Sequence, residues 1–164
     1  MKHLVLTLLT FCSLMASAQN AVVKRQTTKS VVKTKSQTAS SPLDKILVGT
    51  HLLSLSWISW EDFGTVKISK TGKKNVYKIA GMQESRYNDD YLKIQGTITA
   101  QSKTLLLFHG KIIQKISFFN NGQPCIREGK YHFLQTEGRH YWRMQEMTNP
   151  CDGESCDYVD IYLK

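Results

Sequence analysis

The residues of this sequence best suited to chemistry are three cysteines in its second half, Cys125, Cys151 and Cys156. The last two lie within the segment NPCDGESCDYVD, which also carries four acidic side chains. Such residues could form a disulfide, bind a metal ion or supply a reactive thiolate. To choose among these three roles, we need to know the compartment in which the protein works and the secondary-structure elements that carry the cysteines.

The N-terminal segment MKHLVLTLLTFCSLMASA predicts export. It has a positive start, an apolar run and the small-residue pattern Ala16-Ser17-Ala18 that signal peptidase accepts. The run is shorter than the roughly 20 residues of a spanning helix, so we predict a cleavable signal peptide over residues 1–18 and no transmembrane segment. Cys12 lacks the preceding small residue of a lipid attachment site. We therefore expect a secreted or periplasmic protein.

Residues 19–42 are rich in Ser, Thr, Gln and Lys and contain no acidic or aromatic residue. This composition cannot bury enough apolar surface to fold, so it predicts a flexible basic tether. Six of the 22 basic residues precede residue 43, which leaves 16 basic and 13 acidic residues and a net charge of +3 for residues 43–164. A domain this mildly basic, in a secreted chain, does not indicate a nucleic-acid partner.

Residues 43–164 are expected to fold as one all-β domain, because alternating apolar residues and turn signals dominate this region. In LLSLSWISW, for example, Leu53, Leu55 and Trp57 share one face. The predicted strands begin with this segment and continue with residues 63–69, 75–82, 91–99, 104–116, 125–135, 139–147 and 157–163. A helical turn is expected only near Ser41–Ile46.

Short connections between the strands favour an antiparallel meander closed as an eight-stranded barrel, with a β-sandwich as the alternative. The turn Thr71-Gly72-Lys73-Lys74 and the sequence Asn120-Asn121-Gly122 suit tight connections that need positive φ angles. Gly96, Gly110 and Gly129 lie inside predicted strands, where they fit bends of a barrel wall.

This strand number and order resembles the lipocalin and avidin-like small barrels. The resemblance implies a cup that holds a small apolar molecule. The chain departs from the lipocalin pattern at Gly-x-Trp, since Gly49-Thr50-His51 places His in the third position and Trp57 has no glycine two residues before it. No binding residue is therefore carried over from these families.

The cysteines are best explained by a disulfide, the default for a small exported domain. A hairpin formed by residues 125–135 and 139–147 would bring Cys125 and Cys151 to the same open end. Cys125–Cys151 is therefore the favoured pair. The alternatives are Cys125–Cys156 and Cys151–Cys156, and each of the three pairings leaves one cysteine over.

A metal site has less support. Zinc sites pair C-x₂₋₄-C with a second pair or with histidines, and here the histidines are scattered. Asp152, Glu154 and Asp157 form a weak calcium candidate, because they offer carboxylates in one loop but lack the twelve-residue ligand pattern. We predict neither a metal nor another cofactor.

Catalysis is also not expected. Cys125 and His132 are separated by an odd number of strand residues, so they face opposite sides and cannot form a dyad. The sequence also lacks a glycine-rich phosphate loop, Gly-x-Ser-x-Gly and His-Glu-x-x-His. We therefore predict a protein that is not an enzyme.

The candidate ligand site lies on the hairpin of residues 125–147. Arg127 and Tyr131 share one face of its first strand, and Tyr141, Arg143 and Gln145 share a face of its second. Aromatic walls with a few polar groups are typical of ligand pockets. The alternative is ordinary cross-strand pairing on the outside of the sheet.

A second aromatic group, Trp57, Trp60 and Phe63, is expected to plug a barrel end, with an exposed recognition patch as its alternative. We predict a binding module for a small, partly apolar ligand. The alternative is a cell-envelope structural or protein-interaction domain with a filled core.

Overall fold

The computed structural model describes residues 41–163, so the predicted signal peptide and nearly all of the predicted tether lie outside the described residues. The described part folds as a closed barrel of eight antiparallel strands in sequence order, and the last strand pairs with the first. This confirms the predicted all-β fold and the barrel, and the β-sandwich alternative is wrong.

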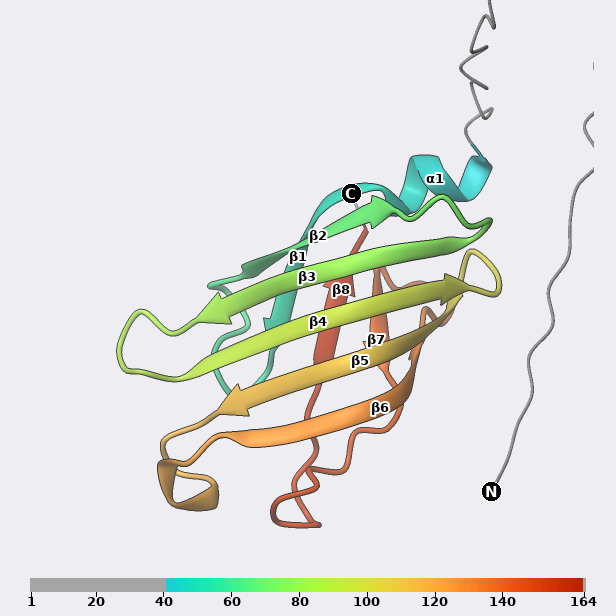
Figure 1. The fold of residues 1–164 in the computed structure, drawn as a ribbon. Coiled ribbons are helices and arrows are strands. Elements are labelled where there is room, and N and C mark those ends of the chain that lie inside the picture. Colours follow the sequence, from blue (N-terminus) through green and yellow to red (C-terminus); the bar gives the residue numbers. More distant parts are fainter. Residues whose placement is uncertain (1–40, 164) are drawn as a thin grey trace, which may run out of the picture. The chain divides into compact units, whose positions relative to one another are not determined.

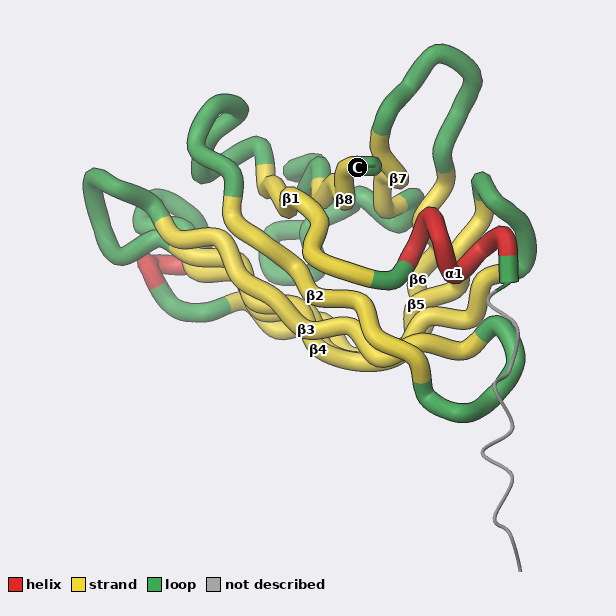
Figure 2. The backbone as a smooth tube through the Cα atoms, turned by 90° about the horizontal axis from the view of Figure 1, so that it is seen from above, coloured by secondary structure: helices red, strands yellow, loops and turns green. Residues whose placement is uncertain are grey.

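The strands are short and follow the predicted segments closely. The elements are α1 (Pro42–Leu47), β1 (Gly49–Leu55), β2 (Gly64–Lys70), β3 (Val76–Glu84), β4 (Tyr91–Ala100), β5 (Leu105–Lys115), a short 3₁₀ turn (Asn120–Gly122), β6 (Cys125–Leu134), β7 (Tyr141–Met144) and β8 (Val159–Tyr162). Strands β2 to β6 lie side by side as one broad layer, with β1, β8 and β7 behind them (Figure 1). The view from above shows the two sides of this flattened barrel (Figure 2).

The interior is built by the alternation seen in the sequence, which turns every second side chain inward. On β4, Leu92, Ile94 and Ile98 are buried while Lys93 and Gln95 are exposed. The inward side chains form one cluster, whose largest fully buried members are Trp142, Tyr77, Phe108 and Phe133. The described barrel is therefore filled by its own side chains, as in a packed core.

Three glycines lie side by side across the wall of the barrel. Gly96 pairs with Gly110, and Gly110 pairs with Gly129. A Cβ atom on Gly110 would lie 2.2 Å from the backbone oxygen of Gln95 and 2.8 Å from the ring of Phe108. The missing side chains of Gly96 and Gly110 let β4 and β5 approach closely and leave room for the Phe108 ring, as expected of bends in a barrel wall.

The sequence overestimated the length of β1, β7 and β8, and β8 covers only Val159–Tyr162 of the predicted residues 157–163. β1 ends at Leu55, so Trp57 lies in the following turn and not on the strand face that carries Leu53 and Leu55. β7 ends at Met144 instead of Met147. The predicted turns are confirmed, with positive φ angles at Gly72 and throughout the Asn-Asn-Gly turn.

The helix α1 caps one end of the barrel. The Ser41 side chain accepts a hydrogen bond from the Leu43 backbone, and Asp44 accepts one from the Ser41 backbone, so the helix begins with a capping box. Asp44 also pairs with Lys70 at 2.6 Å and accepts a hydrogen bond from the Tyr77 hydroxyl at 2.8 Å. The hydrogen bonds from Lys70, Tyr77 and Ser41 lower the pKa of Asp44. These contacts tie α1 to β2 and β3.

We expect an alkaline transition that depends on Tyr77. Burial and the hydrogen bond to Asp44 raise the pKa of Tyr77 to about 12, above the value near 10 of an unfolded tyrosine. The contribution of Tyr77 to stability is therefore complete below about pH 10 and is lost as the pH rises toward about 12. The free energy of unfolding, measured in urea, should fall across this pH window more steeply for the wild type than for Tyr77→Phe.

The matched control is Tyr87→Phe, because Tyr87 is 88% exposed. Phenolate difference spectra should lose a late-titrating tyrosine in Tyr77→Phe and keep it in Tyr87→Phe. Equal titration curves for the two variants would contradict the assignment.

Candidate functional site

The structure divides the five predicted ligand-site residues between two places. Arg127 and Tyr131 point to the inner side of β6, and Gln145 lies just after β7, beside them. Tyr141 and Arg143 lie on the outer side of β7, because Trp142 and Met144 are the inward residues of that strand. The five residues therefore do not line one cavity.

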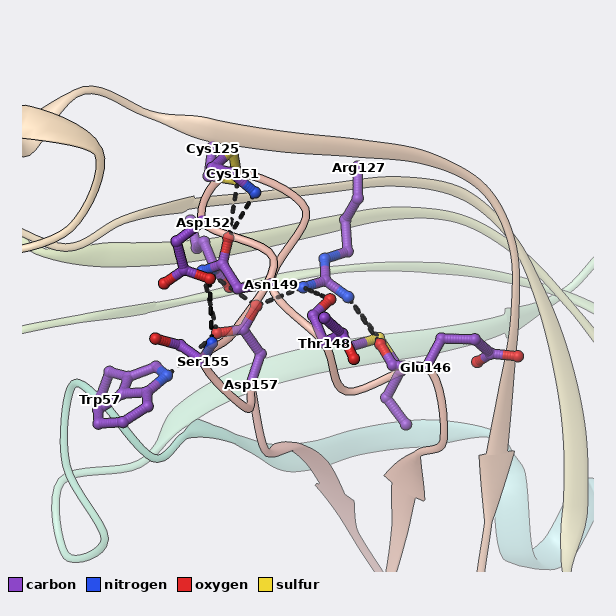
Figure 3. Close-up of polar contacts among 12 residues, drawn as sticks. Trp57, Cys125, Arg127, Glu146, Thr148, Asn149, Cys151, Asp152, Ser155 and Asp157 are labelled. Atoms are coloured by element: carbon purple, nitrogen blue, oxygen red, sulfur yellow. Dashed lines mark hydrogen bonds and ion pairs between the residues drawn. A yellow bond between two sulfur atoms is a disulfide. The ribbon is translucent and has the colours of Figure 1, made fainter.

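A buried charge pair joins β6 to the segment before β8. The Arg127 guanidinium contacts the Asp157 carboxylate, and the two side chains are 5% and 0% exposed. Arg127 also donates to the backbone oxygens of Glu146 at 2.8 Å and Thr148 at 3.3 Å. Figure 3 shows this side chain reaching from β6 across to the segment that follows β7.

The Asp157 carboxylate is the centre of a wider polar network. It accepts hydrogen bonds from Trp57 Nε1 at 3.0 Å, Gln114 Nε2 at 2.9 Å and Asn149 Nδ2 at 3.3 Å. Burial raises the pKa of Asp157, and the positive charge of Arg127 opposes that rise. The network closes the barrel end opposite α1, and the Trp57 ring packs there against Phe119, with centroids 5.0 Å apart.

A disulfide fixes the same end. Cys125 and Cys151 are bonded, as predicted, and Cys156 is free and exposed. The Cys151 backbone donates to the Asn149 side chain at 2.8 Å, which connects the disulfide loop to the Asp157 network. The alternative disulfide pairings are therefore wrong for this structure.

The weak calcium candidates do not come together. Asp157 is committed to Arg127, whereas the Asp152 side chain accepts hydrogen bonds from the backbones of Glu154 and Ser155. A hydrogen bond from the Ser155 side chain, together with those from the Glu154 and Ser155 backbones, lowers the pKa of Asp152. Among residues 41–163, no group of three or more His, Cys, Asp and Glu side chains is placed to hold a metal ion.

After β7 the chain leaves β6 and folds on itself. The backbone N–H of Asp157 donates to the carbonyl oxygen of Met147, and that of Asn149 donates to the carbonyl oxygen of Ser155. Thr148 and Cys156 form an isolated antiparallel β-bridge between them. A groove of about 390 Å³ remains between β6 and this hairpin, lined by Arg127, Tyr131, residues 145–148 and Pro150. We call it the β6 groove. It contains three of the predicted site residues.

A histidine and a glutamate close one end of the β6 groove. The Glu146 carboxylate contacts His132 twice, accepting from its backbone N–H at 2.8 Å and lying 2.7 Å from its Nδ1. Burial raises the pKa of Glu146, but the hydrogen bonds from His132 outweigh this and lower it overall. Both side chains are about half exposed, so the contact is a surface brace.

Arg143 is the centre of an aromatic cluster on the outside of β1, β7 and β8. Its guanidinium donates twice to Asp160, at 2.8 and 2.6 Å, and Asp160 is fully buried. The same guanidinium lies 4.5 Å from the Tyr158 ring centre, 5.0 Å from Tyr141 and 6.0 Å from Trp60. Cation–π contacts of this kind stabilise the pair. We call these five residues the Arg143 cluster.

One family model and one relative among known proteins match this chain. A model of the PM1083 family matches residues 29–163, which include every described strand. The chain belongs to the PM1083 family. A Pasteurella multocida (strain Pm70) protein described as uncharacterized protein PM1083 is 38% identical over 123 residues, which cover 75% of this chain and 77% of that protein. No solved structure matches the chain.

The family model that matches is that of the PM1083 family, so the likeness to lipocalin and avidin-like barrels rests on strand number and order alone. In this member of the PM1083 family, no helix within residues 41–163 has the length and apolar character needed to cross a membrane.

The polar network was not predicted from the sequence. Asp157 was predicted only as a weak calcium ligand, and no role was predicted for Gln114. The signal that could have found Gln114 is its place on the inward face of β5, two residues after the buried Ile112. A buried polar side chain requires a hydrogen-bonding partner, and this need points to a network.

Proposed function

We propose that this protein is a binding module that works outside the cytoplasm, has no catalytic role and takes a small, partly apolar ligand in the β6 groove. The observation that carries the proposal is the composition and size of this groove. Tyr131, Met147 and Pro150 give it apolar surface, and Gln145 and Thr148 add polar groups. Its volume of about 390 Å³ is within the range of small-molecule sites.

The placement outside the cytoplasm rests on the predicted signal peptide and is supported by the Cys125–Cys151 bond, because structural disulfides persist in oxidising compartments. Cell fractionation followed by thiol alkylation tests it. We expect the exported fraction to contain protein with one reactive thiol, Cys156. A cytoplasmic protein with four reactive thiols, including Cys12 of the uncleaved N-terminal segment, would contradict the placement.

The Arg143 cluster and its surroundings favour a second candidate, an interaction domain of the cell envelope. Trp60 is 51% exposed, and the nearby Leu52 and Phe63 are 45% and 37% exposed. Large apolar side chains gathered on the surface are typical of recognition sites. The filled barrel interior agrees with this candidate, since recognition would then occur on the outer surface.

Anilinonaphthalene sulfonate, a partly apolar dye that fluoresces in apolar sites, can separate the two candidates. We expect the dye to bind the oxidised domain and Tyr131→Ala to weaken binding about tenfold, the ratio for about 1.4 kcal/mol. Tyr158→Ala is the matched control, because it removes the same side chain from the Arg143 cluster. Circular dichroism should show that both variants are folded.

The outcome decides between the surfaces. Loss of binding in Tyr131→Ala alone supports the β6 groove. Loss in Tyr158→Ala alone moves the site to the Arg143 cluster and overturns the proposed groove, and no binding to the folded wild type would also count against it.

A further inference from the structure

β6 has an open edge in the wall of the barrel. It pairs with β5 along all ten of its residues, from Cys125 to Leu134, but with β7 only at Phe133 and Leu134. In the described part of the chain, the stretch Ile126–Lys130 therefore has a partner strand on one side and the β6 groove on the other. Strand edges of this kind are templates for another extended chain.

The direction of the backbone groups along this edge follows from His132. Its N–H donates to Glu146 and its carbonyl oxygen accepts from the Gln145 backbone, so its polar groups face the groove side. The β5–β6 register is continuous, without a bulge, and the direction alternates along a strand. The backbone groups of Glu128 and Lys130 therefore face the β6 groove, while those of Gly129 and Tyr131 face β5.

The width of the β6 groove suits one strand. Arg127 leaves the inner side of β6 and must extend fully to reach the carbonyl oxygens of Glu146 and Thr148. The reach of an extended arginine exceeds one strand spacing of about 4.8 Å. We call the part of the β6 groove that Arg127 lines on its inner side the slot. The Cys125–Cys151 bond and the His132–Glu146 contact bound its two ends.

We propose that the β6 groove binds a short extended peptide that pairs antiparallel with Ile126–Lys130. This inference rests on the proposed function and names the class of its ligand. The peptide donates and accepts main-chain hydrogen bonds at Glu128 and Lys130, the mode called β-augmentation. The space between the two bounding contacts limits the paired segment to about five residues, the number in Ile126–Lys130.

The charges beside the slot specify the peptide sequence. Glu128 and Lys130 are exposed on the outer side, two residues apart. Opposite charges on directly paired residues of neighbouring strands stabilise a sheet. Because the peptide runs antiparallel, its acidic residue opposite Lys130 comes first and its basic residue opposite Glu128 comes two positions later.

The residue between these two charges lies opposite Gly129 and faces inward. A Cβ atom built on Gly129 would have only the Tyr131 hydroxyl within 4 Å, at 3.8 Å, so the groove has room at this point. Tyr131 and Met147 provide apolar contacts there. The expected pattern is therefore acidic, apolar, basic.

Two peptides of identical composition test the proposal. Acetylated and amidated Glu-Val-Lys-Thr-Thr should bind the oxidised domain about fivefold more tightly than Lys-Val-Glu-Thr-Thr, as expected for two cross-strand charge pairs. The double variant Glu128→Lys/Lys130→Glu should reverse this preference. Both positions are exposed, so the variant is expected to fold. A preference that the charge exchange leaves unchanged would overturn the proposed register.

Hydrogen exchange gives a readout that tests main-chain pairing directly. Peptide binding should slow exchange of the Glu128 and Lys130 amides, and the Gly129 and Tyr131 amides serve as internal controls because they face β5. A peptide methylated on its main-chain nitrogens should lose binding. Binding without protection of Glu128 and Lys130, or undiminished by methylation, would overturn strand addition.

The outcomes separate this inference from the proposed function. If neither peptide binds but the dye binds in a Tyr131-dependent way, the groove remains a small-molecule site and strand addition is wrong. If peptide and dye both fail with the folded protein, both proposals fall. The protein could instead form a concentration-dependent dimer that Glu128→Lys abolishes. In that case a second copy of the chain occupies the groove, and the peptide proposal is wrong.

Discussion

Replacing Asp157 with alanine is expected to lower the free energy of unfolding by about 3–5 kcal/mol, the usual cost of removing one partner of a buried ion pair. The variant would leave the Arg127 guanidinium, whose side chain is 5% exposed, without its counter-ion. It would also remove the acceptor used by Trp57, Gln114 and Asn149. Urea unfolding followed by tryptophan fluorescence measures the change.

Two comparisons isolate the buried charge. Asp152→Ala removes a carboxylate from the same hairpin at an exposed position, and we expect it to lower stability much less than Asp157→Ala does. The double variant Arg127→Met/Asp157→Leu removes both charges and should recover part of the loss; the rest should remain, because Trp57, Gln114 and Asn149 still lack their acceptor. Equal stability of Asp157→Ala and Asp152→Ala would show that the network does not hold this barrel end.

The second large effect concerns the disulfide. Cys125→Ser/Cys151→Ser should lower the free energy of unfolding by about 3 kcal/mol in the loop-entropy model, since the bond closes a loop with a sequence separation of 26 residues. The loss should concentrate at the barrel end opposite α1, where the bond holds the hairpin after β7 against β6.

The control for this prediction is Cys156→Ser, because Cys156 is free and exposed. Its unfolding in urea should match the wild type, and a reducing agent should destabilise both proteins. The double variant should not respond to the reducing agent. A wild type that is equally stable with and without reductant would contradict the expected contribution of the bond.

Strand number, order and approximate limits could be predicted from the sequence, because each depends on local signals. Alternation along β4 and the turn residues around Gly72 and Asn121 act within a few positions of the chain. The disulfide could also be predicted from the sequence, since hairpin geometry places Cys125 and Cys151 at one end. These features follow from period-two burial and from turn chemistry alone.

The sequence could not show which face of β7 points into the barrel, because both faces carry large side chains. Trp142 and Met144 are inward, while Arg143 lies outward and is neutralised by Asp160, a pairing that depends on β8. An arginine with a buried partner on the outer face has no local signature. The sequence therefore could not separate Arg143 from Arg127.

The β6 groove depends on where β7 stops, and that point is also set by distant residues. The alternation continues to Met147, yet the backbone oxygens of Glu146 and Thr148 turn toward Arg127. Asp157 holds Arg127 in turn, so the segment folds with residues 155–157 instead of extending along β6. Contacts between residues so far apart in the chain are not visible in a short window of sequence.

The pairing of β1 with β8 has a kinetic consequence. Leu53 pairs with Ile161, so barrel closure joins residues from nearly opposite ends of the described chain. Loop closure over such separations is entropically costly, and folding slows as contacts become less local. The hairpins from β2 to β6 can form while the chain emerges from the ribosome. The β1–β8 pairing that closes the barrel cannot form before β8 has been synthesised. An incomplete chain would therefore present open strand edges until the last strand has been made.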